Sequence, residues 1–327
     1  MNVEPILTAL PGLSALVVGD ICLDRWCTYD PSTAEPSRET GIPRIGVTGV
    51  EVTPGAGGTV ANNLAAMGVG RIAVLGAIGE DGFGVELSRA LGARGVDANL
   101  LVRAPGIQTF TYTKIINRDT GVEDHPRLDF INTAPLAPEI ERALLDRLQT
   151  AVDAYDVILV SDQAETSQGG VITPAVRALL ADLAPAYPDK LFLADSRARV
   201  ELFRNVIVKP NQQEAEAACR NLFGRVDYAA LRAHAAAPVL MVTHGKRGVM
   251  VLDGSGETWV PTCPVENPVD ICGAGDSFSA GAATALFVTR SPIEAARFGN
   301  LVASITIMKK GTGTASPEEL RAAASRL

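Results

Sequence analysis

Short apolar runs recur along the chain, and segments with the composition of helices separate most of them. The runs are continuous rather than alternating, which is typical of strands buried on both faces of a sheet. They occupy residues 15–20, 71–76, 156–161, 191–195 and 205–211, and two more at 239–245 and 248–253 flank a tight turn. Strands that alternate with helices predict an α/β fold with a doubly wound, mostly parallel sheet flanked by helices. Ligands of such sheets lie at the carboxyl ends of the strands.

Two regions depart from this alternation and predict a small β-lid that stands off the main sheet. One is about residues 22–52, where three prolines are followed by alternating apolar residues. The other is about residues 107–131, where 109–117 alternate and 127–130 form a candidate partner strand. No repeat or low-complexity linker divides the chain, so we expect a single domain over residues 1–327 with the lid inside it.

Overall charge and cysteine content limit the partners and the compartment. The net charge is −8 and no basic stretch runs along the chain, so neither nucleic acid nor an anionic membrane is an expected partner. No signal peptide and no apolar run of membrane-spanning length can be read. The cysteines are odd in number and never spaced CxxC, which favours reduced thiols over a disulfide frame or a zinc site. We therefore expect a cytoplasmic protein.

A glycine-bearing turn opens a helix of small residues within 267–281. Gly273 and Gly275 let the backbone approach a ligand closely, and the free N–H groups and dipole at a helix N-terminus favour an anion. Asp276 follows in the first turn. A carboxylate beside an anion site makes sense if it takes a proton from a hydroxyl that attacks phosphorus. On these residues alone, the favoured interpretation is that Asp276 caps the helix and the glycines shape an ordinary turn.

Other candidate ligands carry similar alternatives. Asp20 and Asp24 follow the first strand, either as ligands or as turn residues. Residues 54–68 form a second glycine-rich turn into a helix that lacks both the Gly-Lys-Ser/Thr of a P-loop and the spacing of a dinucleotide fingerprint. Asn63 on that helix could present its amide to a crevice or could be an ordinary surface residue.

Five motifs occur in a fixed order along the chain. They are Val-Val-Gly-Asp20, Pro54-Gly55 through Gly68, Lys209-Pro-Asn211-x-x-Glu214, Thr243-x-Gly245-x-x-Gly248 and Asp270-x-x-Gly273-Ala-Gly-Asp276. With these motifs the chain resembles the ribokinase-like (PfkB) carbohydrate kinases from about residue 14 to its end. The resemblance implies the ribokinase-like fold and an ATP-dependent kinase that uses Mg²⁺ and phosphorylates a small-molecule sugar or sugar phosphate.

Within the family the chain is most similar to the heptose 7-phosphate kinase branch, the kinase half of the bifunctional ADP-heptose synthesis protein. The similarity lies in Asp24-Arg25-Trp26, Arg127-Leu-Asp-Phe130 and Gly311 to Leu320. Two departures keep other sugars and nucleosides open as acceptors. The usual glycine pair is displaced to Gly57-Gly58 by Ala56, and Thr59 stands where the family has an asparagine. Ile271 and Cys272 replace a threonine-rich pair, which weakens the case for a monovalent-cation site nearby.

The resemblance also implies roles for individual residues. The N–H groups of Gly273, Ala274 and Gly275 would hold the γ-phosphate while Asp276 acts as the base, in a reaction that depends mainly on positioning and charge stabilisation. Sugar contacts are expected from Asp20, Asp24, Gly57, Gly58 and Asn63, and contacts to a phosphate on the substrate from Lys114 and Arg127. Nucleotide contacts are expected from Asn211, Thr243, Gly245, Gly248 and Asn300, with Mg²⁺ held by Asn211 and Glu214. Lys114 and Arg127 could instead form surface salt bridges, and Glu214 could simply favour its helix dipole.

Two alternatives to a kinase follow from the same pattern. A sugar- or nucleotide-binding regulator on this fold is disfavoured because a pure binder has no need of the base Asp276. A dinucleotide-dependent oxidoreductase is disfavoured because its fingerprint is missing.

The lid has an apolar face that needs cover, and by resemblance we expect a homodimer joined through it.

Overall fold

The computed structural model describes residues 1–166, 168–262 and 265–326, with one large sheet at the centre. Its strand order is β14-β13-β12-β11-β10-β9-β1-β4. Neighbours from β4 to β12 are parallel, whereas β13 and β14 are antiparallel additions. The strands are β1 (Ser14–Gly19), β4 (Arg71–Leu75), β9 (Val157–Asp162), β10 (Leu191–Ser196), β11 (Ile207–Val208), β12 (Leu240–Thr243), β13 (Val249–Asp253) and β14 (Gly256–Val260). The predicted doubly wound, mostly parallel sheet is confirmed.

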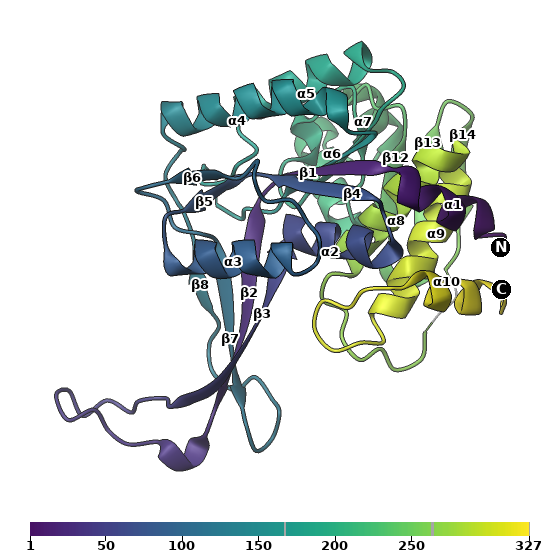
Figure 1. The fold of residues 1–327 in the computed structure, drawn as a ribbon. Coiled ribbons are helices and arrows are strands. Elements are labelled where there is room, and N and C mark those ends of the chain that lie inside the picture. Colours follow the sequence, from purple (N-terminus) through teal and green to yellow (C-terminus); the bar gives the residue numbers. More distant parts are fainter. Residues whose placement is uncertain (167, 263–264, 327) are drawn as a thin grey trace.

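Helices cover both faces of this sheet because successive side chains of each buried strand point to opposite sides (Figure 1). Val17 and Val74 pack on one face, against α1 (Glu4–Ala9), α2 (Gly57–Met67), α3 (Gly82–Gly92), α8 (Ala274–Thr289), α9 (Pro292–Thr306) and α10 (Pro317–Ala324). Leu16 and Leu75 pack on the other, against α4 (Pro138–Ala151), α5 (Pro174–Ala186), α6 (Gln212–Phe223) and α7 (Tyr228–His234). Among the described residues, every helix is too short or too polar to cross a bilayer.

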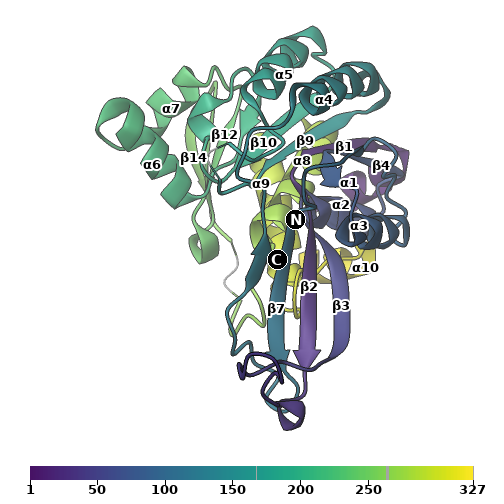
Figure 2. The same cartoon turned by 90° about the vertical axis from the view of Figure 1, so that its left-hand side faces the viewer.

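Four strands form a second sheet with the order β3-β2-β7-β8. They are β2 (Ile21–Tyr29), β3 (Val47–Ala56), β7 (Thr111–Asn117) and β8 (Leu128–Phe130), and a short pair, β5 (Ala77–Gly79) and β6 (Val102–Ala104), lies beside the main sheet. β2 runs antiparallel to β3 and parallel to β7, which pairs with β8 as the alternation suggested. Figures 1 and 2 show these strands leaving the body of the molecule as a projecting lid.

The lid is a direct continuation of the main sheet. Only Asp20 separates β1 from β2, so the path of the backbone at this point sets the direction of the lid. Gly19 precedes the junction with φ +138°, and a Cβ there would collide with the backbone carbonyl of Ser161. Glycine alone fits this position without strain.

We expect Gly19→Ala to lower the free energy of unfolding by about 2 kcal/mol or more, because it combines an unfavourable φ with a backbone collision. Gly12→Ala is the matched control, since Gly12 is exposed and a Cβ there would meet nothing within 4 Å. Urea unfolding monitored by circular dichroism measures both variants. Equal midpoints for the two would show that the junction does not constrain the fold.

Candidate active site

A cavity lies where the lid meets the carboxyl ends of the central strands. Strands of the lid, the starts of α2 and α8, and the residues that follow β9 and β10 all contribute to its wall. The lining residues are Asp24, Arg25, Trp26, Ala56, Thr59, Tyr112, Lys114, Arg127, Gln163, Arg197, Cys272, Gly273, Asp276 and Thr312. Of the residues expected to bind or react, the cavity therefore contains Asp24, Lys114, Arg127, Gly273 and Asp276.

The first turn of α8 faces this cavity. Gly273 is the N-cap residue with φ +75°, and no side chain caps the helix. Asp276 lies inside the first turn, so it is not the cap that the sequence left as an alternative. Ala274 and Gly275 precede it, and their placement beside an uncapped helix N-terminus makes this turn suited to an anion.

The Asp276 carboxyl is tuned towards neutral pH. Burial is the largest effect and, with Asp195 and Asp24, raises its pKa to about 7, whereas Lys209 and Arg197 act in the opposite direction. Burial destabilises a lone carboxylate, and nearby cations stabilise it. A carboxyl with a pKa near the working pH is an effective general base.

An ion pair lies beneath the turn. The Lys209 Nζ is 2.9 Å from Asp195 Oδ2, and Ser279 of α8 donates a hydrogen bond of 3.0 Å to the same oxygen. Lys209 is almost completely buried, and a Cβ on Gly275 would lie 3.8 Å from its Nζ. No role was predicted from the sequence for Lys209 or Asp195. The signals were present, since Lys209 opens the Lys-Pro-Asn motif and Asp195 ends a predicted strand.

The opposite wall carries Asp24 and cationic side chains of the lid. Burial raises the pKa of Asp24 to about 6, while Lys114, Arg127 and Arg197 counteract the rise. Lys114 lies 3.9 Å from a carboxylate oxygen of Glu123, and Arg127 makes two hydrogen bonds of 2.7 Å to Asp129. Both cations therefore line the cavity and form salt bridges at once.

Four expected sugar ligands lie elsewhere: Asp20, Gly57, Gly58 and Asn63. Asp20 is buried, and its carboxylate accepts three backbone hydrogen bonds. Gly57 and Gly58 begin α2 and pack closely, since a Cβ on either would lie 2.7 Å or less from a neighbouring side chain. Asn63 is neither at the cavity nor at the surface, because it is fully buried and its amide donates to the Thr59 carbonyl. The cavity wall on this segment is made instead by Ala56 and Thr59.

The expected nucleotide ligands do not line the cavity either. Asn211 and Thr243 are joined by a parallel β-bridge at the carboxyl ends of neighbouring strands. Gly245 begins a short 3₁₀ turn, and Gly248 ends it with φ +116°. Asn300 lies on α9 and donates a hydrogen bond of 3.5 Å to the carbonyl of Pro261.

Asn211 and Glu214 form a capping box at the start of α6. Glu214 Oε2 accepts the Asn211 N–H at 2.7 Å, and Asn211 Oδ1 accepts the Glu214 N–H at 3.0 Å. Glu214 therefore caps α6, and its place in the first turn also suits the helix dipole, which is the alternative left open for it. Burial, followed by Asp195, raises the pKa of Glu214, and Asp195 also raises that of Asp276. A carboxylate that raises the pKa of two others in this way makes the position suited to a divalent cation with water in its shell, although no preassembled cluster of three ligands exists among the described residues.

The polar cavity residues that were missed include Gln163 and Arg197. Each directly follows a parallel strand, β9 or β10, at the sheet edge where ligands bind. Arg197 pairs with Glu165 and lowers the pKa of both Asp24 and Asp276. Applying the rule of carboxyl ends to every predicted strand would have found both residues.

A family model described as pfkB family carbohydrate kinase matches residues 14–319 of this chain. The chain is a member of the PfkB family. Its curated relatives include the bifunctional protein HldE of Trichlorobacter lovleyi, 32% identical over 99% of this chain and 65% of that protein. The HldE of Geobacter sulfurreducens is 30% identical over 98% of this chain and 64% of its own length. The chain thus spans slightly less than two thirds of these relatives.

Solved structures show the ribokinase-like fold. Phosphofructokinase-2 from Escherichia coli in complex with potassium superposes with a TM-score of 0.72 at 20% identity, covering 96% of this chain and 99% of that one. Ribokinase from Thermotoga maritima gives 0.69 at 21% identity, with coverages of 96% and 99%. At such identities only the fold is shared. PfkB membership makes this chain an ATP-dependent phosphotransferase that acts on a sugar.

We expect kcat/KM for the sugar to rise with pH to a plateau with a midpoint near 7, because Asp276 must be ionised to accept a proton. Arg197 lowers the pKa of Asp276, so Arg197→Gln should move the midpoint to higher pH. Arg220→Gln is the control, since Arg220 is exposed and pairs with Glu216 on α6. If the wild-type protein and both variants had the same pH midpoint of kcat/KM, the titration would not belong to Asp276.

Proposed function

We propose that this chain transfers the γ-phosphoryl group of Mg-ATP to a hydroxyl of a heptose 7-phosphate, with Asp276 as the base. The observation that carries the proposal is the cavity itself. Asp276, whose pKa is about 7, lies beside the uncapped start of α8, and Lys114, Arg127 and Arg197 line the same cavity. One anion site is needed for the γ-phosphate of ATP, and the additional cations suit a phosphate already on the acceptor. Similarity to HldE proteins supports this acceptor class.

The residues divide the work of the transfer. Asp24 accepts hydrogen bonds from sugar hydroxyls and holds the acceptor against the cavity wall. Asp276 accepts the proton of the attacking hydroxyl, and the hydroxyl oxygen forms the new bond to phosphorus as the bond to ADP breaks. The N–H groups of Gly273, Ala274 and Gly275 hold the negative charge on the transferring group. The Lys209 ammonium, which pairs with Asp195 beneath the turn, lies close to Gly275.

The nucleotide and the metal are assigned to residues that do not line the cavity. Thr243, Gly245, Gly248 and Asn300 form the proposed nucleotide site. Asn211 and Glu214 would hold Mg²⁺ through water molecules, and Mg²⁺ when bound neutralises charge on the phosphates. The raised pKa of Glu214 supports this position, because a cation there relieves the repulsion from Asp195.

A second acceptor class, another sugar or a nucleoside, is favoured by one observation. Ala56 and Thr59, the two departures from the family pattern, both line the cavity. They can therefore change which hydroxyls fit. A non-catalytic regulator on this fold is less well supported, because it would not need a carboxyl tuned to neutral pH at an anion site.

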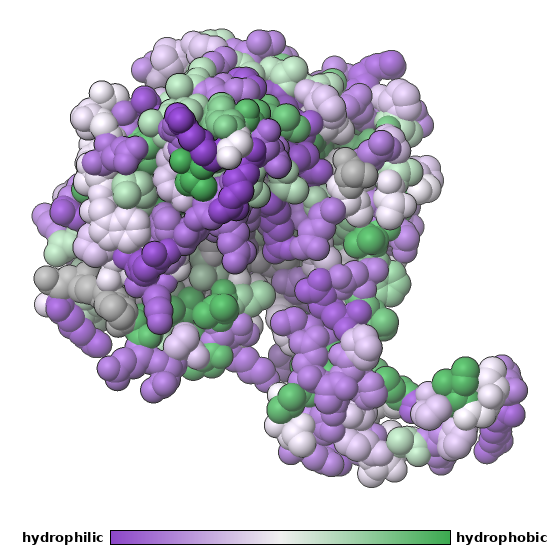
Figure 3. All heavy atoms as spheres, turned by 180° about the vertical axis from the view of Figure 1, so that it is seen from behind, coloured by the Kyte–Doolittle hydropathy of each residue, from purple (hydrophilic) through white to green (hydrophobic). Residues whose placement is uncertain are grey.

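We also propose a cytoplasmic homodimer joined through the lid. β3 is an edge strand, and an uncovered edge tends to be protected by a partner. Exposed apolar side chains on and before β3 support this contact: Ile42, Ile45, Val47, Val50 and Val52. Figure 3 shows the lid as a projection with hydrophobic patches among hydrophilic side chains. Cys22, Cys27, Cys219 and Cys272 are free thiols, as suits a reducing compartment.

The proposed function is tested by ADP release with Mg-ATP and a panel of sugars, nucleosides and sugar phosphates that includes heptose 7-phosphate. We expect heptose 7-phosphate to give the highest kcat/KM. Asp276→Asn should lower kcat by about 10²–10⁴-fold, because the amide cannot accept the proton. Calorimetric titration with ATP shows whether the variant still binds nucleotide. A better unphosphorylated sugar or nucleoside would move the protein to the second acceptor class, and ATP binding without any turnover would favour the regulator.

We expect Arg127→Gln to raise KM for the phosphorylated sugar by about 10- to 100-fold, because a hydrogen bond between two charged groups is lost. The KM values for ATP and for an unphosphorylated sugar should change little. Arg44→Gln is the matched control, since Arg44 is a lid arginine that also forms an ion pair but lies outside the cavity. An equal rise in KM for phosphorylated and unphosphorylated sugars would contradict phosphate recognition by Arg127.

A further inference from the structure

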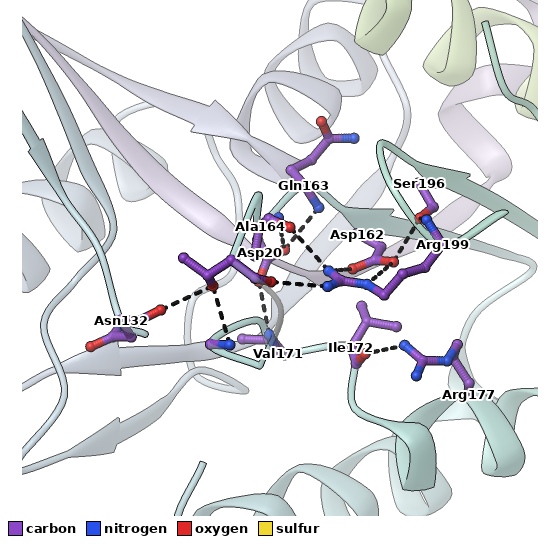
Figure 4. A network of polar contacts seen from close by, with 12 residues as sticks. Asp20, Asn132, Asp162, Gln163, Ala164, Val171, Ile172, Arg177, Ser196 and Arg199 are labelled. Atoms are coloured by element: carbon purple, nitrogen blue, oxygen red, sulfur yellow. Dashed lines mark hydrogen bonds and ion pairs between the residues drawn. The ribbon is translucent and has the colours of Figure 1, made fainter. Parts of the chain in front are cut away.

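The carboxylate of Asp20 is fully occupied by backbone donors, although its position in the sequence suggests a sugar ligand. Oδ2 accepts the N–H groups of Gln163 and Ala164, and Oδ1 accepts that of Val171, each at 2.8 Å. The side chain is 1% exposed, so no oxygen is left for a ligand in the cavity. Figure 4 shows Asp20 between the two ends of the segment that follows β9. We call residues 163–166 and 169–171 the clamped loop.

An ion pair between Arg199 and Asp162 also holds the clamped loop. Arg199 pairs with the buried Asp162 at 2.5 Å and donates hydrogen bonds of 3.1 Å to the carbonyls of Ala164 and Thr166 (Figure 4). Asp162 also accepts a hydrogen bond of 2.7 Å from Ser196 at the end of β10. The loop is thus fixed to β1 by Asp20 and to the ends of β9 and β10 by Arg199.

The far end of the clamped loop contacts the base of the lid. Thr166 Oγ1 donates to the carbonyl of Asn132 at 3.0 Å, and a Cβ on Gly169 would collide with that carbonyl. Asn132 follows β8 and exchanges two hydrogen bonds with Gln108, which precedes β7. Glycine at position 169 therefore allows the loop to pack directly on the segments that carry β7 and β8.

The near end of the loop reaches the cavity. Gln163 lines the cavity, and Glu165 forms the ion pair with Arg197, another lining residue. Arg197 in turn lowers the pKa of Asp276 and of Asp24. One short loop therefore contacts the base of the lid at one end and holds an active-site arginine at the other.

We propose that Asp20 is a positioning residue, whose three backbone hydrogen bonds hold the clamped loop so that Gln163 and Arg197 are correctly placed against the sugar. The proposal rests on the proposed function and reassigns Asp20 from substrate contact to loop support. A displacement of about 1 Å in an active-site group can cost about 10²-fold in rate. Disturbing the loop should therefore weaken sugar binding and slow phosphoryl transfer, and it should leave ATP binding unchanged.

The first test compares Asp20→Asn with the wild-type protein. An amide has one acceptor oxygen and a donor group in place of two acceptors, so it cannot satisfy the donors on both sides of the carboxylate. We expect faster hydrogen exchange at the amides of Gln163, Ala164 and Val171, and kcat/KM for the sugar lowered about 10- to 100-fold. The KM for ATP should stay within about twofold of the wild-type value.

The matched control is Asp30→Asn, because Asp30 is also buried and its carboxylate accepts backbone and side-chain hydrogen bonds, but within the lid. It should leave exchange in the clamped loop unchanged. A double-mutant cycle with Glu165→Gln adds a second test. Both changes act through the placement of Arg197, so their combined loss should be smaller than the product of the separate losses.

Two results would overturn the proposal. If activity falls while exchange in the clamped loop is unchanged, Asp20 acts on the substrate directly. If neither activity nor exchange changes, the loop does not depend on Asp20. A wild-type protein without turnover on any panel member would refute the proposed function, whereas hydrogen exchange would still test the clamp. Should Asp20→Asn fail to fold, Arg199→Lys removes the loop contacts of the guanidinium and is expected to give the same pattern.

Discussion

The short junction between β1 and β2 is the constraint on which the rest of the molecule depends. One residue, Asp20, separates the centre of the main sheet from the lid. The turn is possible because Gly19 adopts φ +138° against the backbone at Ser161. Through its three hydrogen bonds, Asp20 also fixes the loop after β9. The relative placement of sheet, lid and cavity wall is therefore decided within a few residues of backbone and does not rely on side chains that meet across the cavity.

Competition between buried charges is the second determinant of the site. Burial alone would favour the protonated forms of Asp24 and Asp276, and the pKa values of about 6 and 7 are the balance between burial and nearby cations. Arg197 lowers both values, so the two walls of the cavity are coupled electrostatically. If the acceptor carries a phosphate, as proposed above, its negative charge beside Arg197 would raise the pKa of Asp276.

The sequence could predict the fold well because the strand and helix patterns are periodic and the order of the motifs is specific. Four residues assigned to the site from the sequence, Asp24, Lys114, Arg127 and Asp276, line one cavity. The prediction failed where a motif residue serves packing, as with Asn63. A motif shows that a residue type is required at a position, but the direction of its side chain depends on tertiary packing. Arg197 was missed for the converse reason, since it belongs to no motif and gains its role from the strand that it follows.

Ala56 is a residue of the cavity wall at which the chain departs from the family pattern. It has φ +51°, a backbone conformation that costs a non-glycine residue about 1–3 kcal/mol, and it lies at the wall of the cavity. The family pattern has glycine there, for which this conformation carries no such cost. A strained alanine puts a methyl group at the cavity wall, where it narrows the space beside Thr59. Because strain of this kind persists only where the surrounding structure enforces it, the packing around Ala56 must hold this conformation in place.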